Sequence, residues 1–163
     1  MDSPADLDDE EDFVVVPDCQ TQSQGDIPDA FHLPAFRGID LFEISIDELE
    51  RHFSSGSLTS WKYTRICLGR IQKINPYLEC VIETSPDALE HARMLDEQRV
   101  KAHVEGPLHG VPVLVKDNMA TADKMQTTAG SWALGCIVPK DAHTVKLLRK
   151  AGAVILGKSN LDE

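Results

Sequence analysis

The sequence predicts an α/β fold with a mainly parallel sheet flanked by helices, which follows an acidic leader. Two apolar runs, 111–115 and 153–156, have the composition of strands buried on both faces. A segment with helical spacing lies between them, as expected for the crossover that joins two parallel strands. The leader is indicated by charge: residues 1–36 contain ten acids and no Lys or Arg, and so carry -10 of the net charge of -11.

Residues 1–36 are expected to be mostly disordered, and residues 37–163 to form the folded domain. The leader contains four prolines and a polar run at 20–24, so it buries too little apolar surface to offset its chain entropy. The acidic balance argues against nucleic acid or an anionic membrane as a partner, because both are bound mainly through clustered Lys and Arg. The sequence has neither a secretory signal nor a long apolar span, so we expect a soluble, cytoplasmic protein.

The first two predicted elements are helices. Ser45 and Glu48 have the spacing of a capping box at the start of a short amphipathic helix, and Gly56 provides its stop. Thr59 or Ser60 can cap a second helix, with apolar residues at near-helical spacing. We expect this second helix to end at Asn75-Pro76, because the residue before proline is biased away from helical conformation.

A strand, a third helix and a second strand are expected next. Residues 78–82 have strand composition. Ser85 can cap a helix that has Pro86 at its first helical position and runs to about His103. After a Gly- and Pro-rich loop, the strand at 111–115 ends in Lys116.

The last predicted elements are a helix and a strand. Asp141 is the expected cap of a fourth helix at 142–150, and Gly152 terminates it. The apolar run 153–156 then forms the next buried strand.

The four cysteines of the sequence show no pattern of a metal site. They lie at positions 19, 67, 80 and 136, and none has the close Cys or His neighbours that zinc requires. We expect ordinary thiols and no metal.

Lys116 is the candidate catalytic residue. Open α/β sheets place ligands and reactive groups at the C-terminal ends of their strands, where Lys116 is expected. Most lysines at strand ends simply keep the ammonium in water, so a functional role requires burial. Burial lowers the pKa of a lysine, and the neutral amine can then accept a proton from a serine, as in the Ser-Lys variants of hydrolytic enzymes.

The residues around Lys116 resemble the lysine motif of the amidase signature family. The string Gly-Pro-Leu-His-Gly-Val-Pro-Val-Leu-Val-Lys-Asp-Asn at 106–118 carries the resemblance. Further matches follow at 127–131, 151–158 and 160–163, and the similarity covers about residues 41–163. The lysine string is long enough to be specific.

The resemblance implies a hydrolase of carbon–nitrogen amide bonds, with a mixed sheet surrounded by helices. The family's catalytic set is a Ser, a second Ser on a cis peptide and a Lys; Lys116 would be that lysine, relaying a proton through the second Ser. The substrate would be a small-molecule amide, and no metal or organic cofactor is implied. The family includes stand-alone amidases and the amide-transferring subunit of glutamyl-tRNA amidotransferase. The residue string at 106–110 is more similar to that of the stand-alone type.

Both serines of the family's catalytic set lie beyond the position that corresponds to Glu163. We therefore expect Lys116 to lack its serine partner and this chain alone to be inactive. Ser131 and Ser159 are the serines closest to motif residues, but a turn and a loop hydrogen bond explain them more simply. The incomplete sheet is also expected to leave an exposed edge that allows self-association.

A second hypothesis assigns an interaction role to the leader. Acids at 8–12 precede Phe13, two spacers and Val16, a pattern similar to the short motif that binds ubiquitin-like autophagy modifiers. An extended segment of this type adds a strand to a partner's sheet, while its two anchors fill pockets. The alternative is a solvated acidic tail with a local apolar cluster.

A peptide of residues 5–20 tests this hypothesis. Replacing Phe13 and Val16 with Ala is expected to weaken its binding to such a modifier, because both pockets lose their apolar anchors. Titration calorimetry measures the affinity; an affinity unchanged by the double replacement rejects the interaction role.

Overall fold

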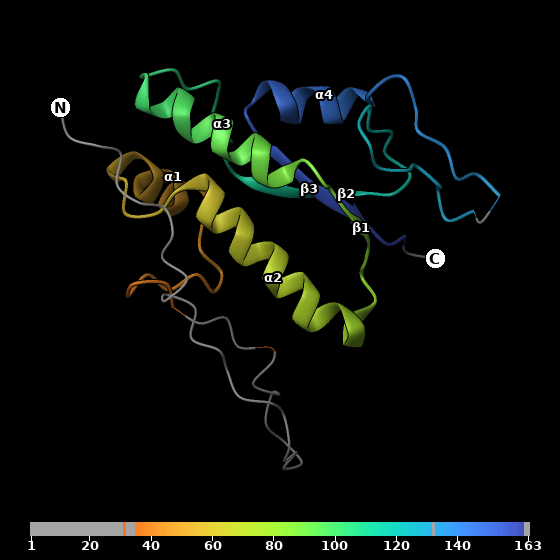
Figure 1. The fold of residues 1–163 in the computed structure, drawn as a ribbon, viewed down its shortest axis with the longest axis horizontal. Helices are drawn as coiled ribbons and strands as arrows, with labels where there is room; N and C mark the ends of the chain where they lie inside the picture. The colour runs from red at the N-terminus through yellow and green to blue at the C-terminus, as the bar shows by residue number, and fades with distance from the viewer. Residues whose placement is uncertain (1–30, 32–34, 132, 162–163) are drawn as a thin grey trace, which may run out of the picture. The chain divides into compact units, whose positions relative to one another are not determined.

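The computed structural model describes residues 31, 35–131 and 133–161 (Figure 1). The expected leader, with the anchors Phe13 and Val16, thus falls almost entirely outside the described residues. The helices and strands, in chain order, are α1 (Ile46–Ser55), α2 (Ser60–Leu78), β1 (Val81–Thr84), α3 (Ala88–Val100), β2 (Pro112–Lys116), α4 (His143–Lys150) and β3 (Val154–Ser159).

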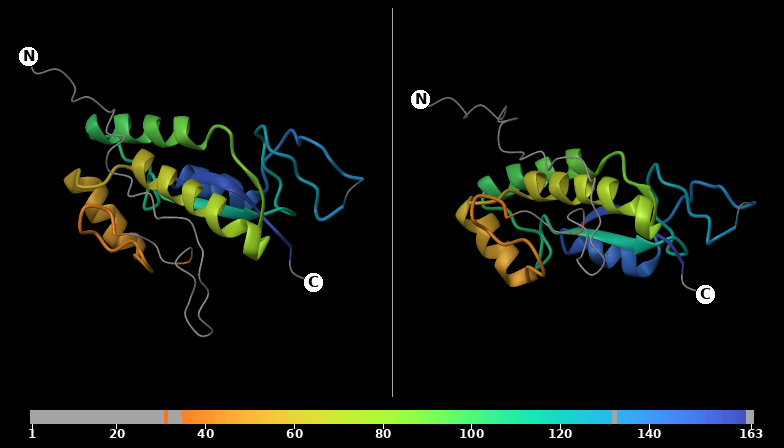
Figure 2. Two further views of the ribbon diagram at one scale, coloured as in Figure 1. Left: turned by 60° about the horizontal axis from the view of Figure 1, so that its bottom comes forward. Right: turned by 90° about the horizontal axis from the view of Figure 1, so that it is seen from below.

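The sheet has three strands in the order β1-β3-β2. β3 runs parallel to β2 and antiparallel to β1, so the sheet is mixed. α2 and α3 lie on one side of the sheet and α4 on the other (Figure 2). The structure therefore confirms the predicted α/β class, and α4 belongs to the crossover between the two parallel strands.

Apolar clusters hold the layers together. Ala92 and Leu95 of α3 pack with Val154 and Leu156 of β3, and the apolar face of α2 adjoins them. On the other face of the sheet, Val145 of α4 packs with residues of both parallel strands, namely Val115 and Ile155. A third cluster, around Leu49 and Phe53 of α1, contacts the start of β2. β3 is buried on both faces, as its continuous apolar sequence predicts. The same expectation was wrong for β2, which lies at an edge of the sheet and leaves Leu114 38% exposed.

The predicted caps of α1 and α2 are confirmed. The Ser45 hydroxyl accepts the Glu48 N–H (3.2 Å), and the Glu48 carboxylate accepts the Ser45 N–H (3.0 Å). Gly56 ends α1 with a φ of 74°, a left-handed conformation in which glycine lacks the steric penalty of other residues. Thr59 caps α2 by accepting the N–H of Lys62 (3.1 Å).

The predicted end of α2 was wrong. The helix continues through Pro76 to Leu78, and the chain leaves it at Glu79, which has a φ of 50°. Only two helical residues follow Pro76, so the proline disturbs a single final turn. The Asn75 side chain secures this exit: it donates to the carbonyl of Val81 and accepts the Val81 N–H, both at 2.9 Å. β1 therefore begins at Val81, later than the predicted 78–82.

The predicted caps of α3 and α4 were also wrong. α3 begins at Ala88 after Asp87, which makes no side-chain cap bond, and the backbone N–H of Ser85 donates to the carbonyl of Leu156 in β3 (2.8 Å). α4 begins at His143, and the Asp141 carboxylate instead accepts the N–H of Ala122 (2.6 Å). α3 ends at Val100, before the expected His103, and β3 extends to Ser159, beyond the predicted 153–156.

α2 receives a second cap from α3. The two carboxylate oxygens of Asp96 accept the backbone N–H groups of Ser60 and Trp61, each at 2.8 Å. The Ser60 hydroxyl donates to the Gly110 carbonyl (2.6 Å), which ties the same helix end to the segment before β2. Burial raises the pKa of Asp96 and outweighs the lowering by the two N–H donors. Asp96 therefore links α3 to the start of α2, although β1 separates the two helices along the chain.

Replacing Asp96 with Ala is expected to lower the free energy of unfolding by about 2 kcal/mol, because two N–H groups at the start of α2 lose their acceptors. Urea unfolding followed by circular dichroism measures the loss. Glu97→Ala is the matched control, because it removes an exposed carboxylate from the next position of the same helix. Equal stability of the two variants would contradict the assigned role of Asp96.

Candidate active site

Lys116 ends β2 at the C-terminal edge of the parallel strand pair. Its Cα is the register partner of Ser159, the last residue of β3, so the two strands end together. The side chain of Lys116 is half-buried. Side chains alternate along a strand, and the preceding Val115 packs in the cluster with α4. Lys116 thus lies on the opposite face, toward the layer of α2 and α3.

Asp117 continues the strand pairing and then reverses the chain direction. Its N–H donates to the Ser159 carbonyl (3.0 Å), and the Met119 N–H donates to the Lys116 carbonyl (2.8 Å). The Asp117 side chain is only 1% exposed. Residues 116–119 are therefore a turn anchored to the end of β3.

The Asp117 carboxylate is surrounded by donors from a later part of the loop. It accepts the N–H (3.2 Å) and the hydroxyl of Thr128, and the N–H of Gly130 (3.4 Å). Burial raises the pKa of Asp117, but these donors together with the charge of Lys158 outweigh it, and the pKa lies below its ordinary value. The carboxylate is therefore the favoured form at neutral pH.

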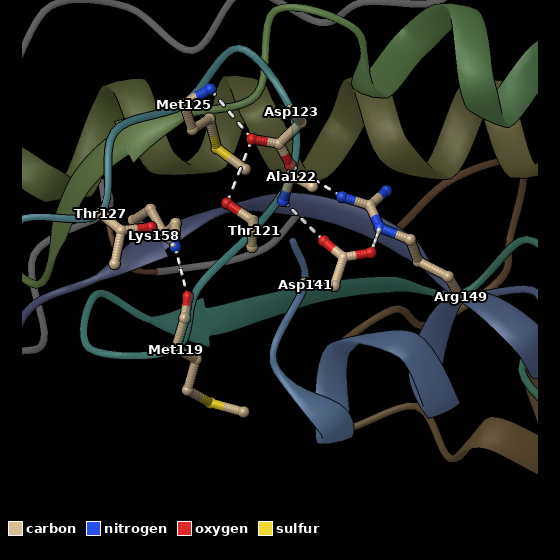
Figure 3. Close-up of polar contacts among 9 residues, drawn as sticks. All are labelled: Met119, Thr121, Ala122, Asp123, Met125, Thr127, Asp141, Arg149 and Lys158. Atoms are coloured by element: carbon tan, nitrogen blue, oxygen red, sulfur yellow. Dashed lines mark hydrogen bonds and ion pairs between the residues drawn. The ribbon is translucent and has the colours of Figure 1, made fainter. Parts of the chain in front are cut away.

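Lys158 is buried beside this carboxylate. It lies in β3 with 0% exposure, and its Nζ donates to the Met119 carbonyl (2.6 Å) and to the Thr127 hydroxyl (3.2 Å) (Figure 3). Burial lowers the pKa of Lys158, and attraction to Asp117 and to other acids opposes this shift. The ammonium thus joins the turn after Lys116 to the start of the 127–131 segment.

The other half of the loop is fastened to α4. Asp123 accepts the Met125 N–H (2.9 Å) and pairs with the guanidinium of Arg149 (2.8 Å). Arg149 also pairs with Asp141 (3.3 Å), whose carboxylate holds the N–H of Ala122, as Figure 3 shows. These contacts fasten residues 122–125 of the loop to α4 and to the residue pair that precedes it.

The segment that precedes β2 is held by a buried histidine. His109 is 3% exposed, and its Nδ1 accepts the Glu105 N–H (3.1 Å). The ring proton therefore lies on Nε2, which donates to the Leu95 carbonyl of α3 (3.0 Å). Both ring nitrogens are used in structural bonds, so His109 has no free nitrogen for proton transfer.

Ser131 and Ser159, the two serines considered as partners of Lys116, lie in different parts of the structure. Ser131 lies in a turn, where its N–H donates to Thr128 (2.9 Å) and its hydroxyl accepts the Ala133 N–H (3.3 Å). This agrees with the simpler explanation of Ser131 as a turn residue. Ser159 is beside Lys116 in the strand register, and its carbonyl anchors the turn through Asp117.

Sequence reasoning missed Lys158 and Asp117 as members of the site. One signal was available: Lys158 lies two residues after the apolar run 153–156, and a strand that continued for these two residues would bury its charge and require partners inside the protein. In the part of the chain that the structure describes, no group of three or more His, Cys, Asp or Glu residues could hold a metal ion. Within the same residues, no helix has the length and apolar character needed to cross a membrane.

Comparison with known proteins places these residues in a family context. The model of the family described as Amidase matches residues 62–163. A Schizosaccharomyces pombe protein named as an amidase is 46% identical over 134 residues, which are 82% of this chain and 23% of that protein. A glutamyl-tRNA(Gln) amidotransferase subunit from Symbiobacterium thermophilum is 41% identical over 123 residues, 74% of this chain and 25% of the relative.

Solved structures of amidases also have a similar fold. The crystal structure of the native peptide amidase from Stenotrophomonas maltophilia matches with a TM-score of 0.71 and 44% identity, over 74% of this chain and 25% of that protein. The chain thus spans about a quarter of the length of the relatives it matches. The matched region contains the lysine strand, the loop and β3, and the chain belongs to the amidase signature family.

Proposed function

We propose that this chain carries the lysine-bearing part of an active site that hydrolyses carbon–nitrogen bonds in small-molecule amides. Membership of the amidase family supports the reaction class. The observation that carries the proposal is the place of Lys116: a half-buried lysine at the C-terminal edge of a parallel strand pair, followed by a turn with buried anchors.

In the proposed reaction, Lys116 is the base. Its neutral amine accepts a proton through a serine relay from a nucleophilic serine, whose oxygen attacks the amide carbonyl carbon. The proton passes to the leaving nitrogen as the carbon–nitrogen bond breaks, and water then hydrolyses the acyl ester. The family resemblance assigns the nucleophile and the relay to serines beyond the position that corresponds to Glu163, so we propose that the 163-residue chain alone does not catalyse the reaction.

We favour a stand-alone amidase over an amide-transferring subunit. The Schizosaccharomyces pombe relative is 46% identical, against 41% for the Symbiobacterium thermophilum amidotransferase subunit, and its match covers more of this chain. The near-neutral folded part, with 17 acids and 16 bases in residues 37–163, also lacks the basic excess expected of a surface that binds tRNA.

A chimera tests the role of Lys116. Residues 41–163 replace the aligned segment of the Stenotrophomonas maltophilia peptide amidase, and hydrolysis of a peptide amide is followed by ammonia release. Lys116→Ala is expected to lower kcat by about a thousandfold or more, because the serine loses its base. Lys146→Ala, which removes an exposed lysine of α4, is the control. An active chimera in which both variants retain full kcat would refute the assignment.

The chain alone provides a second test. The purified 163-residue protein is expected to release no ammonia from simple amides above the rate of the buffer. Hydrolysis that Lys116→Ala abolishes would contradict this expectation and would show that a serine within the chain serves as the nucleophile.

A further inference from the structure

Two opposite charges are buried beneath the strand ends next to Lys116. The carboxylate of Asp117 is 1% exposed and the ammonium of Lys158 is 0% exposed. Two consecutive threonines form hydrogen bonds with these charges. The Thr127 hydroxyl accepts from Lys158, and the Thr128 hydroxyl donates to Asp117. Each threonine therefore contacts one of the two charges.

Stability alone does not explain a buried lysine at this position. Removing an ammonium from water carries a large desolvation penalty, which its contacts within the protein must offset. Lys158 also lies in β3 among apolar residues that fill the layers of the fold. What distinguishes Lys158 from these neighbours is that its ammonium makes contacts that only a donor can make.

Those contacts fix the turn that leaves Lys116. The Met119 N–H donates to the Lys116 carbonyl (2.8 Å), while the Met119 carbonyl accepts from Lys158 (2.6 Å). Asp117 shares a peptide unit with Lys116 and is held through both its N–H and its carboxylate. The backbone on the C-terminal side of Lys116 is therefore restrained at positions 116, 117 and 119.

We propose that Lys158 and Asp117 are positioning residues for Lys116: by bridging to Met119, Thr127 and Thr128 they fix the strand end from which the Lys116 side chain projects. The proposal rests on the proposed function of Lys116. It assigns to Lys158 no contact with a substrate and no proton transfer.

Lys158→Met in the 163-residue chain tests this role. The variant keeps an unbranched side chain and removes the ammonium. Amide exchange at Met119, Thr128 and Gly130, read by NMR, is expected to accelerate at least about tenfold, while exchange in α3 stays unchanged. Lys124→Met is the matched control, because it removes an exposed lysine from the same loop.

A second readout reports on Lys116 itself. In the same samples, acetylation of each lysine by a limiting amount of acetic anhydride is quantified by mass spectrometry, with the exposed Lys146 as the internal reference. Lys158→Met is expected to change the relative rate at Lys116 at least about threefold, because the half-buried amine loses its fixed surroundings. A structural role alone would leave this ratio unchanged in folded protein.

Thr127→Val provides a second variant for the same test, in case the Lys158→Met protein does not fold. It removes one acceptor of Lys158 with little change of shape, and the same two effects are expected in the same direction. Unchanged exchange at Met119 and Thr128 together with an unchanged Lys116 ratio in a folded variant would overturn the proposal. These readouts need no catalysis, so an active chimera that retains full kcat after Lys116→Ala would refute the proposed function without affecting them.

Discussion

The structure depends on the parallel pairing of β2 with β3 between two helical layers. Because Asp117 and Lys158 are buried near the C-terminal end of this pair, their polar groups must find partners within the protein. The chain meets this requirement with its own loop: Asp117 receives donors from Thr128 and Gly130, and Lys158 donates to Met119 and Thr127. The same pairing that brings Lys116 to the sheet edge therefore also dictates the path of the residues that follow it.

The helices are joined by polar contacts as specific as those of the loop. Asp96 of α3 accepts two N–H groups at the start of α2, and His109 links the segment before β2 back to α3. Ser60 connects the same helix end to Gly110, two residues before β2. The start of β2 is thus fixed by the α2–α3 layer and its end by the loop, so Lys116 is at the end of a strand restrained at both termini.

Local chemistry predicted much of this fold, and long-range contacts account for what it missed. The capping box at Ser45, the glycine stop at Gly56 and the Thr59 cap depend only on neighbours within one helical turn, and all three are confirmed. Ser85 and Asp141 had equally good local cap signals, but their polar groups bond to residues distant in sequence. At the site, Lys116 could be selected from its position and the family resemblance, whereas the partners of Lys158 become visible only when β3 is placed beside β2.

The two buried charges affect stability with pH in the same direction. The pKa of Asp117 is below its ordinary value in the folded state, so its ionised form contributes stability that is lost as the pH falls through the folded pKa. The pKa of Lys158 is also lowered, and the folded state therefore binds its proton less well than the unfolded chain. The desolvation penalty of Lys158 is fully present below its folded pKa and declines as the pH rises toward the ordinary value. Both shifts therefore make stability rise with pH, but in separate windows: the window of Asp117 lies below the ordinary pKa of an aspartate, and that of Lys158 lies below the ordinary pKa of a lysine. Near neutral pH the charge of Asp117 therefore stabilises the fold, whereas the charge of Lys158 carries a desolvation penalty. What the ammonium contributes in return is its pair of bonds to Met119 and Thr127, which hold the chain that follows the end of β2.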